Sequence, residues 1–328
     1  MSDVIIAVDL GGTRIRAARL NDRLAIESRQ EILTEADKGL ESTLHRMKDL
    51  IRSVWPPDSA VVTGIGISSP GPLNPMTGVV VAAPNLPGWH NVPIVKILQD
   101  EFGVPAYLGN DANVAALAET VMGAARGCRH VIYITVSTGI GAGMICDGRM
   151  LLGRAGLAAE GGHIILVAGH GVSSLELEAA GPALALKARA RIEAGMSSLV
   201  TDMVRGDLTQ ITGATVGQAA QHNDPLALEI IQQGGQMLGL GIVTFLHLFN
   251  PEIVVIGGSV AMNLGELLFS PMRAAIQQHC IDEAYWRDLR IEPAQLGDNV
   301  GIFGAASLVV TQGGLADVNE ALAKLNPN

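Results

Sequence analysis

Residues 4–21 read VIIAVDLGGTRIRAARLN, two apolar stretches separated by a Gly-Gly-Thr turn. The pattern predicts a strand, a tight turn and a second strand. The same order returns in residues 130–153, HVIYITVSTGIGAGMICDGRMLLG, with Ser-Thr-Gly at the turn. Any hairpin can use glycine at its turn, but two similar hairpins, one in each half of the chain, indicate a duplicated core.

The segments around these hairpins alternate between helix and strand patterns. We expect a helix over 40–54, a strand over 61–69 and a helix from about 112 to 125. Residues 253–256 form a further apolar strand that ends at Gly257-Gly258 and precedes a helix. Strands that alternate with helices predict an α/β protein.

Residues 227–250 show an apolar helical pattern that contains four glycines. Each glycine inside a helix costs roughly 1 kcal/mol relative to alanine. The four are Gly234, Gly235, Gly239 and Gly241. We therefore expect other helices to pack closely against this one.

Composition limits the class of protein. At 328 residues the chain is long enough for two lobes. The net charge of −10 and the lack of a long basic run argue against nucleic acid or an anionic membrane as partner. No signal peptide or long apolar run is visible, and the three cysteines have no C-x-x-C spacing. We expect a cytoplasmic protein.

The turn after the first strand is suited to phosphate. In Asp9–Thr13, DLGGT, two glycines expose backbone N–H groups and the threonine adds a hydroxyl. Asp9 at the strand end could hold Mg²⁺ through water. The motif is neither a P-loop nor G-x-G-x-x-G, and a purely structural hairpin stays open. The turn Ser137–Gly143 is a second phosphate candidate, and Gly257-Gly258 would let a flat ring or ribose approach.

Asn110-Asp111 precedes the helix expected from about 112. An acidic or amide side chain at a helix N-terminus is commonly a cap. Asn110 also offers an amide for a hydroxyl, and the helix dipole would hold the Asp111 carboxylate ionised, able to accept a proton from an alcohol. Both interpretations stay open.

The stretch Ala159–Glu178, AEGGHIILVAGHGVSSLELE, gathers carboxylates and imidazoles without any cysteine. Zinc on Glu160, His163 and His170 would need three converging ligands, and no H-E-x-x-H pattern occurs. Carboxylates and an imidazole can instead hydrogen-bond the adjacent hydroxyls of a polyol. Polyol binding is the better interpretation.

Taken in order, DLGGT, PGP, PN-LPGW, GNDAN, STGIGAG, AAEGGH, SLE, NPEIVVIGG and LGD-GIFGAA resemble the ROK family of sugar kinases and sugar-responsive repressors. The resemblance covers nearly the whole chain. It implies a two-lobed, actin-like or ribonuclease-H-like ATPase fold with duplicated α/β lobes. The small lobe would span 1–111, joined by a C-terminal helix at about 302–328, and the large lobe would span 112–301.

The resemblance also implies roles for individual residues. Asp111 would be the general base for the sugar hydroxyl. The sugar would be bound by Gly71, Asn85, Asn110, Asp111, Glu160, His163 and Glu176. ATP would be bound by Asp9, Gly11, Gly12, Thr13, Thr138 and Gly139 at its phosphates and by Gly257 and Gly258 at its adenosine.

One departure concerns zinc. Many family members carry C-x-C-G-x-x-G-C between the histidine and the later glutamate, and those cysteines bind zinc. The corresponding positions are Val167, Gly169 and Ser174, so we expect no structural zinc, and packing or hydrogen bonds must orient His163. Arg14 stands where lysine is common, a milder change.

These observations lead to an ATP- and Mg²⁺-dependent hexose kinase, with glucose O6 as the first acceptor. The alternatives are an N-acetylmannosamine or N-acetylglucosamine kinase, a fructokinase, or a non-catalytic sugar-binding regulator. A DNA-binding repressor is disfavoured because the first strand begins at about Val4, which leaves no room for a preceding helix-turn-helix. The family commonly forms dimers or tetramers, so we expect a homodimer or homotetramer.

Overall fold

The computed structural model describes residues 3–57, 60–168 and 171–325. The chain divides into two compact units. Unit 1 comprises Met1–Val131, Gly143–Ala159 and Ala294–Asn328, and unit 2 comprises Ile132–Ala142 and Glu160–Pro293. The lobe boundary predicted between residues 111 and 112 stays a prediction.

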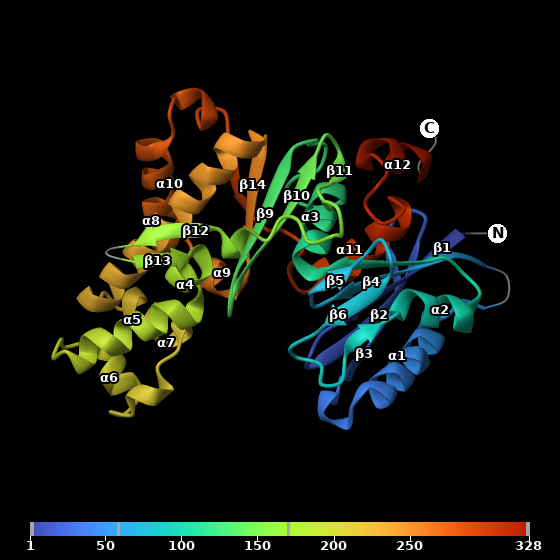
Figure 1. Cartoon of the computed structure of the whole chain (residues 1–328), viewed down its shortest axis with the longest axis horizontal. Coiled ribbons are helices and arrows are strands. Elements are labelled where there is room, and N and C mark those ends of the chain that lie inside the picture. The colour runs from blue at the N-terminus through green and yellow to red at the C-terminus, as the bar shows by residue number, and fades with distance from the viewer. Residues whose placement is uncertain (1–2, 58–59, 169–170, 326–328) are drawn as a thin grey trace. The chain divides into compact units, whose positions relative to one another are not determined.

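A five-stranded sheet forms the centre of unit 1 (Figure 1), with the strand order β3-β2-β1-β4-β8. Its strands are β1 (Asp3–Leu10), β2 (Arg14–Asn21), β3 (Ile26–Leu33), β4 (Val61–Ser69) and β8 (Ala106–Asn110). β1, β2 and β3 pair antiparallel, whereas β4 is parallel to both β1 and β8. The hairpin predicted over 4–21 and the strand predicted over 61–69 are confirmed.

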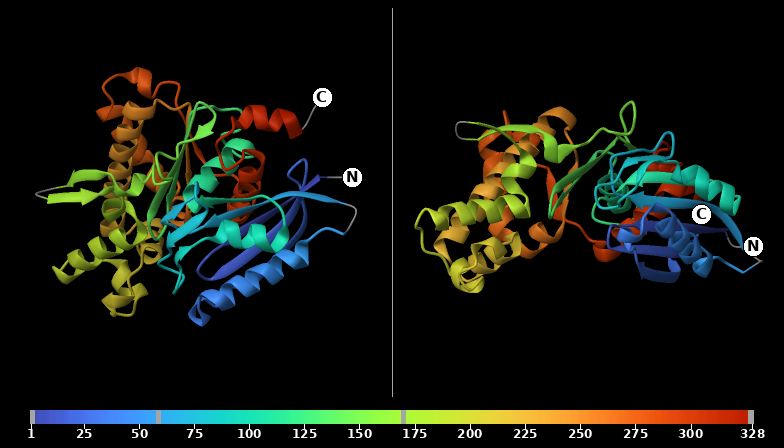
Figure 2. Two further views of the ribbon diagram at one scale, coloured as in Figure 1. Left: turned by 45° about the vertical axis from the view of Figure 1, so that its right-hand side comes forward. Right: turned by 60° about the horizontal axis from the view of Figure 1, so that its bottom comes forward.

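The two faces of this sheet are covered by different helices (Figures 1 and 2). Alternate residues of β1, such as Ile6 and Val8, join one apolar core with α1 (Leu40–Val54) and α2 (Ile94–Phe102). The helix predicted over 40–54 is therefore confirmed.

The other face carries α11 (Val300–Val310). A Cβ atom at Gly66 would lie 1.7 Å from the carbonyl oxygen of Ala305, so only glycine lets α11 approach β4 this closely. Gly301 of α11 also lies close to Asp9, because a Cβ atom at this position would be 2.5 Å from the Asp9 carboxyl carbon.

Unit 1 contains further helices and strands. They are η1 (Ala36–Lys38), β5 (Leu73–Asn74), β6 (Val79–Ala82), β7 (His90–Val92), α3 (Asp111–Val121), β11 (Arg149–Met150), η5 (Gly297–Asn299) and α12 (Val318–Leu325). The expectation that α3 continues to residue 125 is wrong. Glu119 Oε2 accepts a hydrogen bond from the Ala124 backbone N–H at 2.8 Å, and this side-chain contact accompanies a turn after Val121.

A second five-stranded sheet has the order β11-β10-β9-β14-β15. Its longer strands are β9 (Val131–Val136), β10 (Ile140–Cys146), β14 (Ile253–Gly257) and β15 (Arg290–Pro293). In chain order, β9, β10, β11, β14 and β15 take the positions that β1, β2, β3, β4 and β8 have in the first sheet, and β14 and β15 also pair in parallel. The duplicated core predicted from the two hairpins is confirmed.

Most of unit 2 is helical (Figure 1). Its helices are η2 (Gly161–His163), α4 (Leu175–Ala179), α5 (Gly181–Glu193), α6 (Leu199–Met203), η3 (Leu208–Gln210), α7 (Gly213–Gln221), α8 (Pro225–Phe249), α9 (Ser259–Leu264), α10 (Glu266–His279) and η4 (Glu283–Tyr285). A separate two-stranded sheet pairs β12 (Ile165–Ala168) with β13 (Gly171–Ser174). Within the described part of the chain, no helix is both long and apolar enough to cross a membrane.

The glycines of α8 allow the close helix packing that their number predicted. A Cβ atom at Gly235 would lie 2.6 Å from the carbonyl oxygen of Leu268 on α10. One at Gly239 would lie 2.5 Å from the carbonyl oxygen of Met272 on the same helix. These distances are below van der Waals contact, so the prediction is confirmed.

Candidate active site

Parallel pairing brings several predicted residues to one edge of the first sheet. Asp9 pairs with Ser68 in register, and Ser69 pairs with Asn110. The carboxyl ends of β1, β4 and β8 therefore meet, and ligands of open α/β sheets bind outside such ends. Asp9, Asn110 and Asp111 thus lie at one edge of unit 1.

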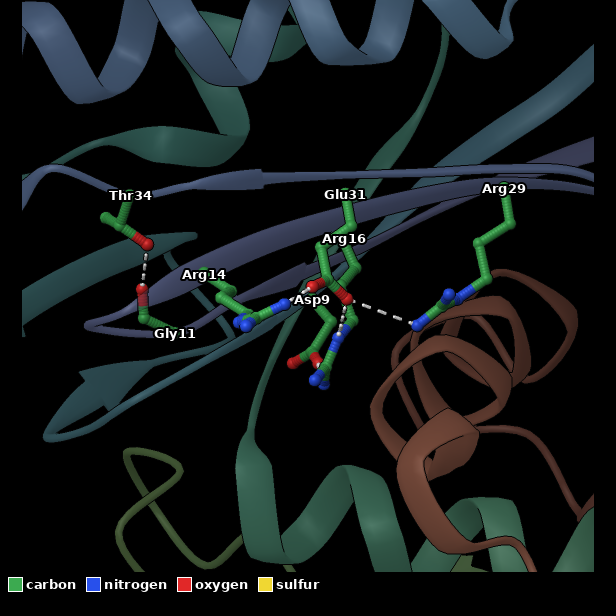
Figure 3. A network of polar contacts seen from close by, with 7 residues as sticks. All are labelled: Asp9, Gly11, Arg14, Arg16, Arg29, Glu31 and Thr34. Carbon is green, nitrogen blue, oxygen red and sulfur yellow. Dashed lines mark hydrogen bonds and ion pairs between the residues drawn. The ribbon is translucent and has the colours of Figure 1, made fainter.

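The Gly11–Thr13 turn is held at both sides by Thr34 (Figure 3). The Thr34 hydroxyl donates to the Gly11 carbonyl oxygen at 2.6 Å, and the Thr34 backbone N–H donates to the Thr13 carbonyl oxygen at 2.8 Å. Since two carbonyl groups are fixed by Thr34, the turn is preorganised. The Gly11 N–H donates to the Arg14 carbonyl oxygen at 2.9 Å, so the N–H groups of this turn that an anion could meet are those of Gly12 and Thr13.

Asn85 lies directly beside this turn. A Cβ atom at Gly12 would be 2.8 Å from the Cβ of Asn85, so Gly12 is required by a close contact. The structure thereby brings a predicted sugar-binding residue next to a predicted phosphate-binding residue, both within unit 1.

Asp9 belongs to a network of charged side chains (Figure 3). Arg16 Nη1 lies 3.2 Å from Asp9 Oδ2, and Arg16 Nε donates to Glu31 Oε2 at 2.9 Å. Burial raises the pKa of Asp9, although the charge and hydrogen bond of Arg16 and a hydrogen bond from Ser68 oppose the shift. Arg16 therefore partly neutralises a carboxylate that is otherwise poorly solvated.

Glu31 holds the arginines of this network. It forms ion pairs with Arg14 and with Arg29, the latter at 3.4 Å. Hydrogen bonds from Arg14 and then Arg16 lower the pKa of Glu31 to about 2. Sequence analysis did not single out Arg16 or Glu31, although Arg16 is the cross-strand partner of both Asp9 and Glu31. The strand registers of the β1–β2 and β2–β3 hairpins would have indicated both residues.

Asn110 and Asp111 begin α3 and do act as caps. Asn110 Oδ1 accepts from the Ala112 backbone N–H at 3.1 Å, and Asp111 Oδ1 accepts from the same N–H at 2.8 Å. Asn110 Nδ2 faces Gly71, where a Cβ atom would be only 2.9 Å away. The Asp111 side chain is exposed. The capping role is therefore present, and it leaves the Asp111 carboxylate accessible to a ligand.

In unit 2, Glu176 of α4 contacts the turn between β9 and β10. Its Oε2 accepts a hydrogen bond from the Ile140 backbone N–H at 2.9 Å. A Cβ atom at Gly139 would lie 2.6 Å from the same oxygen, so the Glu176 carboxylate would have to shift if this residue carried a side chain. Glu176 is thus tied to the predicted phosphate turn through backbone.

Gly161 and Gly162 allow η2 to pack closely against β10. A Cβ atom at Gly162 would lie 1.9 Å from the Ile140 carbonyl oxygen, and one at Gly161 would lie 2.7 Å from the Cβ of Ala142. The two glycines fix the backbone that carries Glu160 and His163, whose side chains are exposed. Backbone packing therefore orients this segment.

Part of the predicted zinc-loop region falls outside the described residues, namely Gly169 and His170. Within 3–57, 60–168 and 171–325, no group of three or more His, Cys, Asp or Glu side chains converges as a metal site.

A cavity of about 550 Å³ opens in unit 2 beside the β9–β10 turn. Its lining comes from the turn and from α5, α7 and α9, namely Ser137, Thr138, Gly181, Pro182, Ala185, Ile211, Thr212, Gly213, Ala214, Gly217, Gln218, Gln221, Ser259, Val260, Asn263 and Leu264. None of these residues is charged. The volume and the apolar walls with a few neutral polar groups are typical of a small-molecule site.

Gly258 lies between the end of β14 and Ser259, which lines the cavity. Its φ of +91° and a potential Cβ contact of 2.4 Å with the Val136 carbonyl oxygen both require glycine. The next residue, Ser259, lines the cavity, and its hydroxyl lies 2.9 Å from that of Ser137. Of the residues predicted from sequence, Thr138 lines the cavity and Gly258 directly precedes the lining residue Ser259. The lining residues of α5 and α7 were not predicted, because separate helices bring them together.

Comparison with known proteins decides the family. The model of the ROK family matches residues 5–312. The chain belongs to the ROK family. The predicted actin-like, ribonuclease-H-like ATPase fold is confirmed by this match and by the solved ROK kinase structures that superimpose on the chain.

Individual ROK relatives differ in their named activities. A glucokinase of Thermotoga maritima is 32% identical over 93% of this chain and 96% of its own length. A xylose repressor of Caldicellulosiruptor bescii is 31% identical over 94% of this chain and 78% of its own length. The crystal structure of a ROK glucokinase from Streptomyces griseus, in complex with glucose and AMPPNP, is 30% identical, with a TM-score of 0.74 over 93% of this chain and 98% of that one.

Proposed function

We propose that this protein is an ATP-dependent sugar kinase that transfers the γ-phosphate to a hexose, with the O6 hydroxyl of glucose as the first acceptor. The observation that carries the proposal is the β9–β10 turn, which opens onto an uncharged cavity of nucleoside size. A phosphate-binding turn beside such a cavity suits a nucleotide. The similarity to glucokinases supports the choice of reaction and acceptor.

Asp111 would act as the general base. Its exposed carboxylate accepts the proton of the sugar hydroxyl while the hydroxyl oxygen bonds to the γ-phosphorus. The bond from the γ-phosphorus to the β,γ-bridging oxygen breaks, and ADP leaves with that oxygen. Backbone N–H groups of Gly12 and Thr13, and those of the Thr138-Gly139 turn, would stabilise the phosphate charge. Phosphoryl transfer depends mainly on such positioning and electrostatics.

The residues proposed to bind the sugar occur in both units, and each set is described within its own unit. In unit 1, Asn110 lies beside Gly71, and Asn85 lies beside the Gly12 turn. In unit 2, Glu160 and His163 follow the backbone packed on Ile140, and Glu176 bonds to the Ile140 N–H. These amides, carboxylates and imidazole can hydrogen-bond adjacent sugar hydroxyls.

Asp9 is the residue that we propose to hold Mg²⁺. Magnesium in nucleotide enzymes is held by one or two carboxylates together with substrate phosphates. Asp9 supplies a carboxylate at the end of β1, next to the glycine turn, and the adjacent Arg16 offsets its charge. The ion, when bound, would neutralise charge on the phosphates.

A second candidate is a non-catalytic sugar-binding regulator, because a xylose repressor is among the relatives. The exposed Asp111 carboxylate and the two phosphate turns favour the kinase. The acceptor alternatives are N-acetylmannosamine, N-acetylglucosamine and fructose.

The test is a coupled ADP-release assay with Mg²⁺, without added zinc, against hexoses and N-acetylhexosamines. We expect sugar-dependent ADP release with a preference for glucose. A preference for another sugar would keep the kinase and change the acceptor. Sugar binding detected by calorimetry without ADP release from any sugar would replace the kinase with the regulator.

A further inference from the structure

The cavity of unit 2 has one wall made of residues with almost no side chain. Gly213, Ala214 and Gly217 lie on one face of α7 and line the cavity. A Cβ atom at Gly213 would lie 2.7 Å from the Cα of Gly181, and one at Gly217 would lie 3.0 Å from Leu264 Cδ2. α7 therefore approaches α5 and α9 closely and leaves a smooth, narrow wall. Such a wall suits a planar ring.

The polar groups of the cavity differ between its two ends. Hydroxyls of Ser137 and Ser259 lie together, 2.9 Å apart, at the start of α9. The amides of Gln221 and Asn263 belong to the far ends of α7 and α9. Ser259 and Asn263 are four residues apart, about 6 Å along a helix axis. A nucleotide with its phosphates at the β9–β10 turn would therefore direct its base towards the amides.

The Gln221 amide is held in one orientation. Its Nε2 donates to the backbone carbonyl oxygen of Asn263 at 2.9 Å. With Nε2 bonded to backbone, the hydrogen-bonding atom that remains on the Gln221 amide is Oε1, which is an acceptor. Adenine carries an amino donor at the position where guanine carries the acceptor O6. If Gln221 Oε1 faces guanine O6, two acceptors meet and neither receives a hydrogen bond. Binding of a guanine nucleotide is then weaker than binding of an adenine nucleotide.

We propose that Gln221 selects adenine over guanine nucleotides as phosphoryl donors. This inference rests on the proposed kinase function and adds a specificity-determining residue to it. Gln221 is exposed at the rim of the cavity, so we expect a preference on the order of 10-fold for ATP over GTP.

The test compares kcat/KM for ATP and GTP in the wild type, in Gln221→Met and in Gln232→Met. Gln232 is an exposed glutamine of α8 that does not line the cavity. We expect Gln221→Met to reduce the ATP preference to within about 2-fold, with the sugar KM unchanged, while Gln232→Met keeps the wild-type ratio. An unchanged ratio in Gln221→Met, or a wild type that uses both nucleotides equally, would overturn the inference.

Calorimetric binding of ADP and GDP separates this inference from the proposed function. If no sugar supports ADP release, the kinase proposal fails. Weaker binding of GDP than ADP that is lost in Gln221→Met would still support base selection. Equal binding of the two nucleotides, or no binding of either, would overturn it.

Discussion

Glu176 Oε2 accepts a hydrogen bond from the backbone N–H of Ile140 at 2.9 Å, and this bond ties α4 to the first residue of β10. The same oxygen occupies the space that a side chain at Gly139 would need. A residue that the sequence assigned to the sugar thus also determines the shape of the turn assigned to phosphate.

Replacing Glu176 tests this coupling. Glu176→Gln keeps an acceptor for the Ile140 N–H, whereas Glu176→Leu leaves the donor unpaired. An unsatisfied buried donor costs about 1–3 kcal/mol, so we expect Glu176→Leu to be less stable than Glu176→Gln in urea unfolding. The KM for ATP should also rise more in the leucine variant. Equal stability and equal KM values would show that the bond does not support the turn.

Gly162 tests the packing of η2 on β10. Its Cβ atom would lie 1.9 Å from the Ile140 carbonyl oxygen, and that oxygen belongs to backbone. We expect Gly162→Ala to lower the free energy of unfolding by about 1–3 kcal/mol and to weaken sugar binding, because Glu160 and His163 move with η2. Gly171→Ala is the control, since no atom lies within 4 Å of its Cβ position. Similar unfolding curves for the two variants would contradict the packing argument.

Asp111→Asn tests the general base. The asparagine can still accept from the Ala112 N–H as Asp111 does at 2.8 Å, so we expect the fold and the sugar Kd to be retained. Loss of a general base lowers kcat by roughly 10²–10⁴-fold, which a single-turnover or coupled assay would measure. Asp100→Asn, at an exposed aspartate of α2, should leave kcat unchanged. Turnover close to that of the wild type would remove Asp111 from this role.

Glu31→Gln tests the charged network around Asp9. The pKa of Glu31 is lowered from 4.5 to about 2 in the folded protein, so between these values the unfolded state binds more protons than the folded state. The stability that Glu31 contributes is therefore fully present above about pH 4.5 and is lost as pH falls through 2. We expect Glu31→Gln to be less stable than the wild type at pH 7, with the difference shrinking towards pH 2.

Urea unfolding at several pH values measures this difference. High salt should reduce it, because ion pairs near the surface are screened. The exposed Glu41 offers a control, and Glu41→Gln should stay within about 0.5 kcal/mol of the wild type. A difference that does not change between pH 7 and pH 2 would mean that Glu31 acts through packing and not through its charge.

Local patterns were sufficient for several elements of the fold. The hairpin of residues 4–21 and the helix over 40–54 follow from the periodicity of apolar residues, and the structure has both. The end of α3 could not be predicted in this way. The Glu119 carboxylate caps the Ala124 N–H, and the pattern of apolar residues carries no information on such a bond.

The candidate site was only partly accessible from sequence. The glycine turns follow predicted strands, and Asn110 and Asp111 precede a predicted helix, so local patterns reveal both. Gln221, by contrast, lines the cavity only because α7 and α9 lie side by side, and nothing in its neighbouring residues signals this. A cavity is made by elements distant along the chain, so its lining depends on packing.

The sequence by itself determined the duplicated α/β sheets and the positions of the two glycine turns, because strand periodicity and the need for glycine at a turn are local properties. Only the tertiary structure decided that Arg16 and Ser68 flank Asp9, that Glu176 bonds to Ile140, and that Gln221 is anchored on Asn263. These contacts join residues from different elements. They depend on strand register and on how closely glycine lets the backbones approach, which the packed chain as a whole determines.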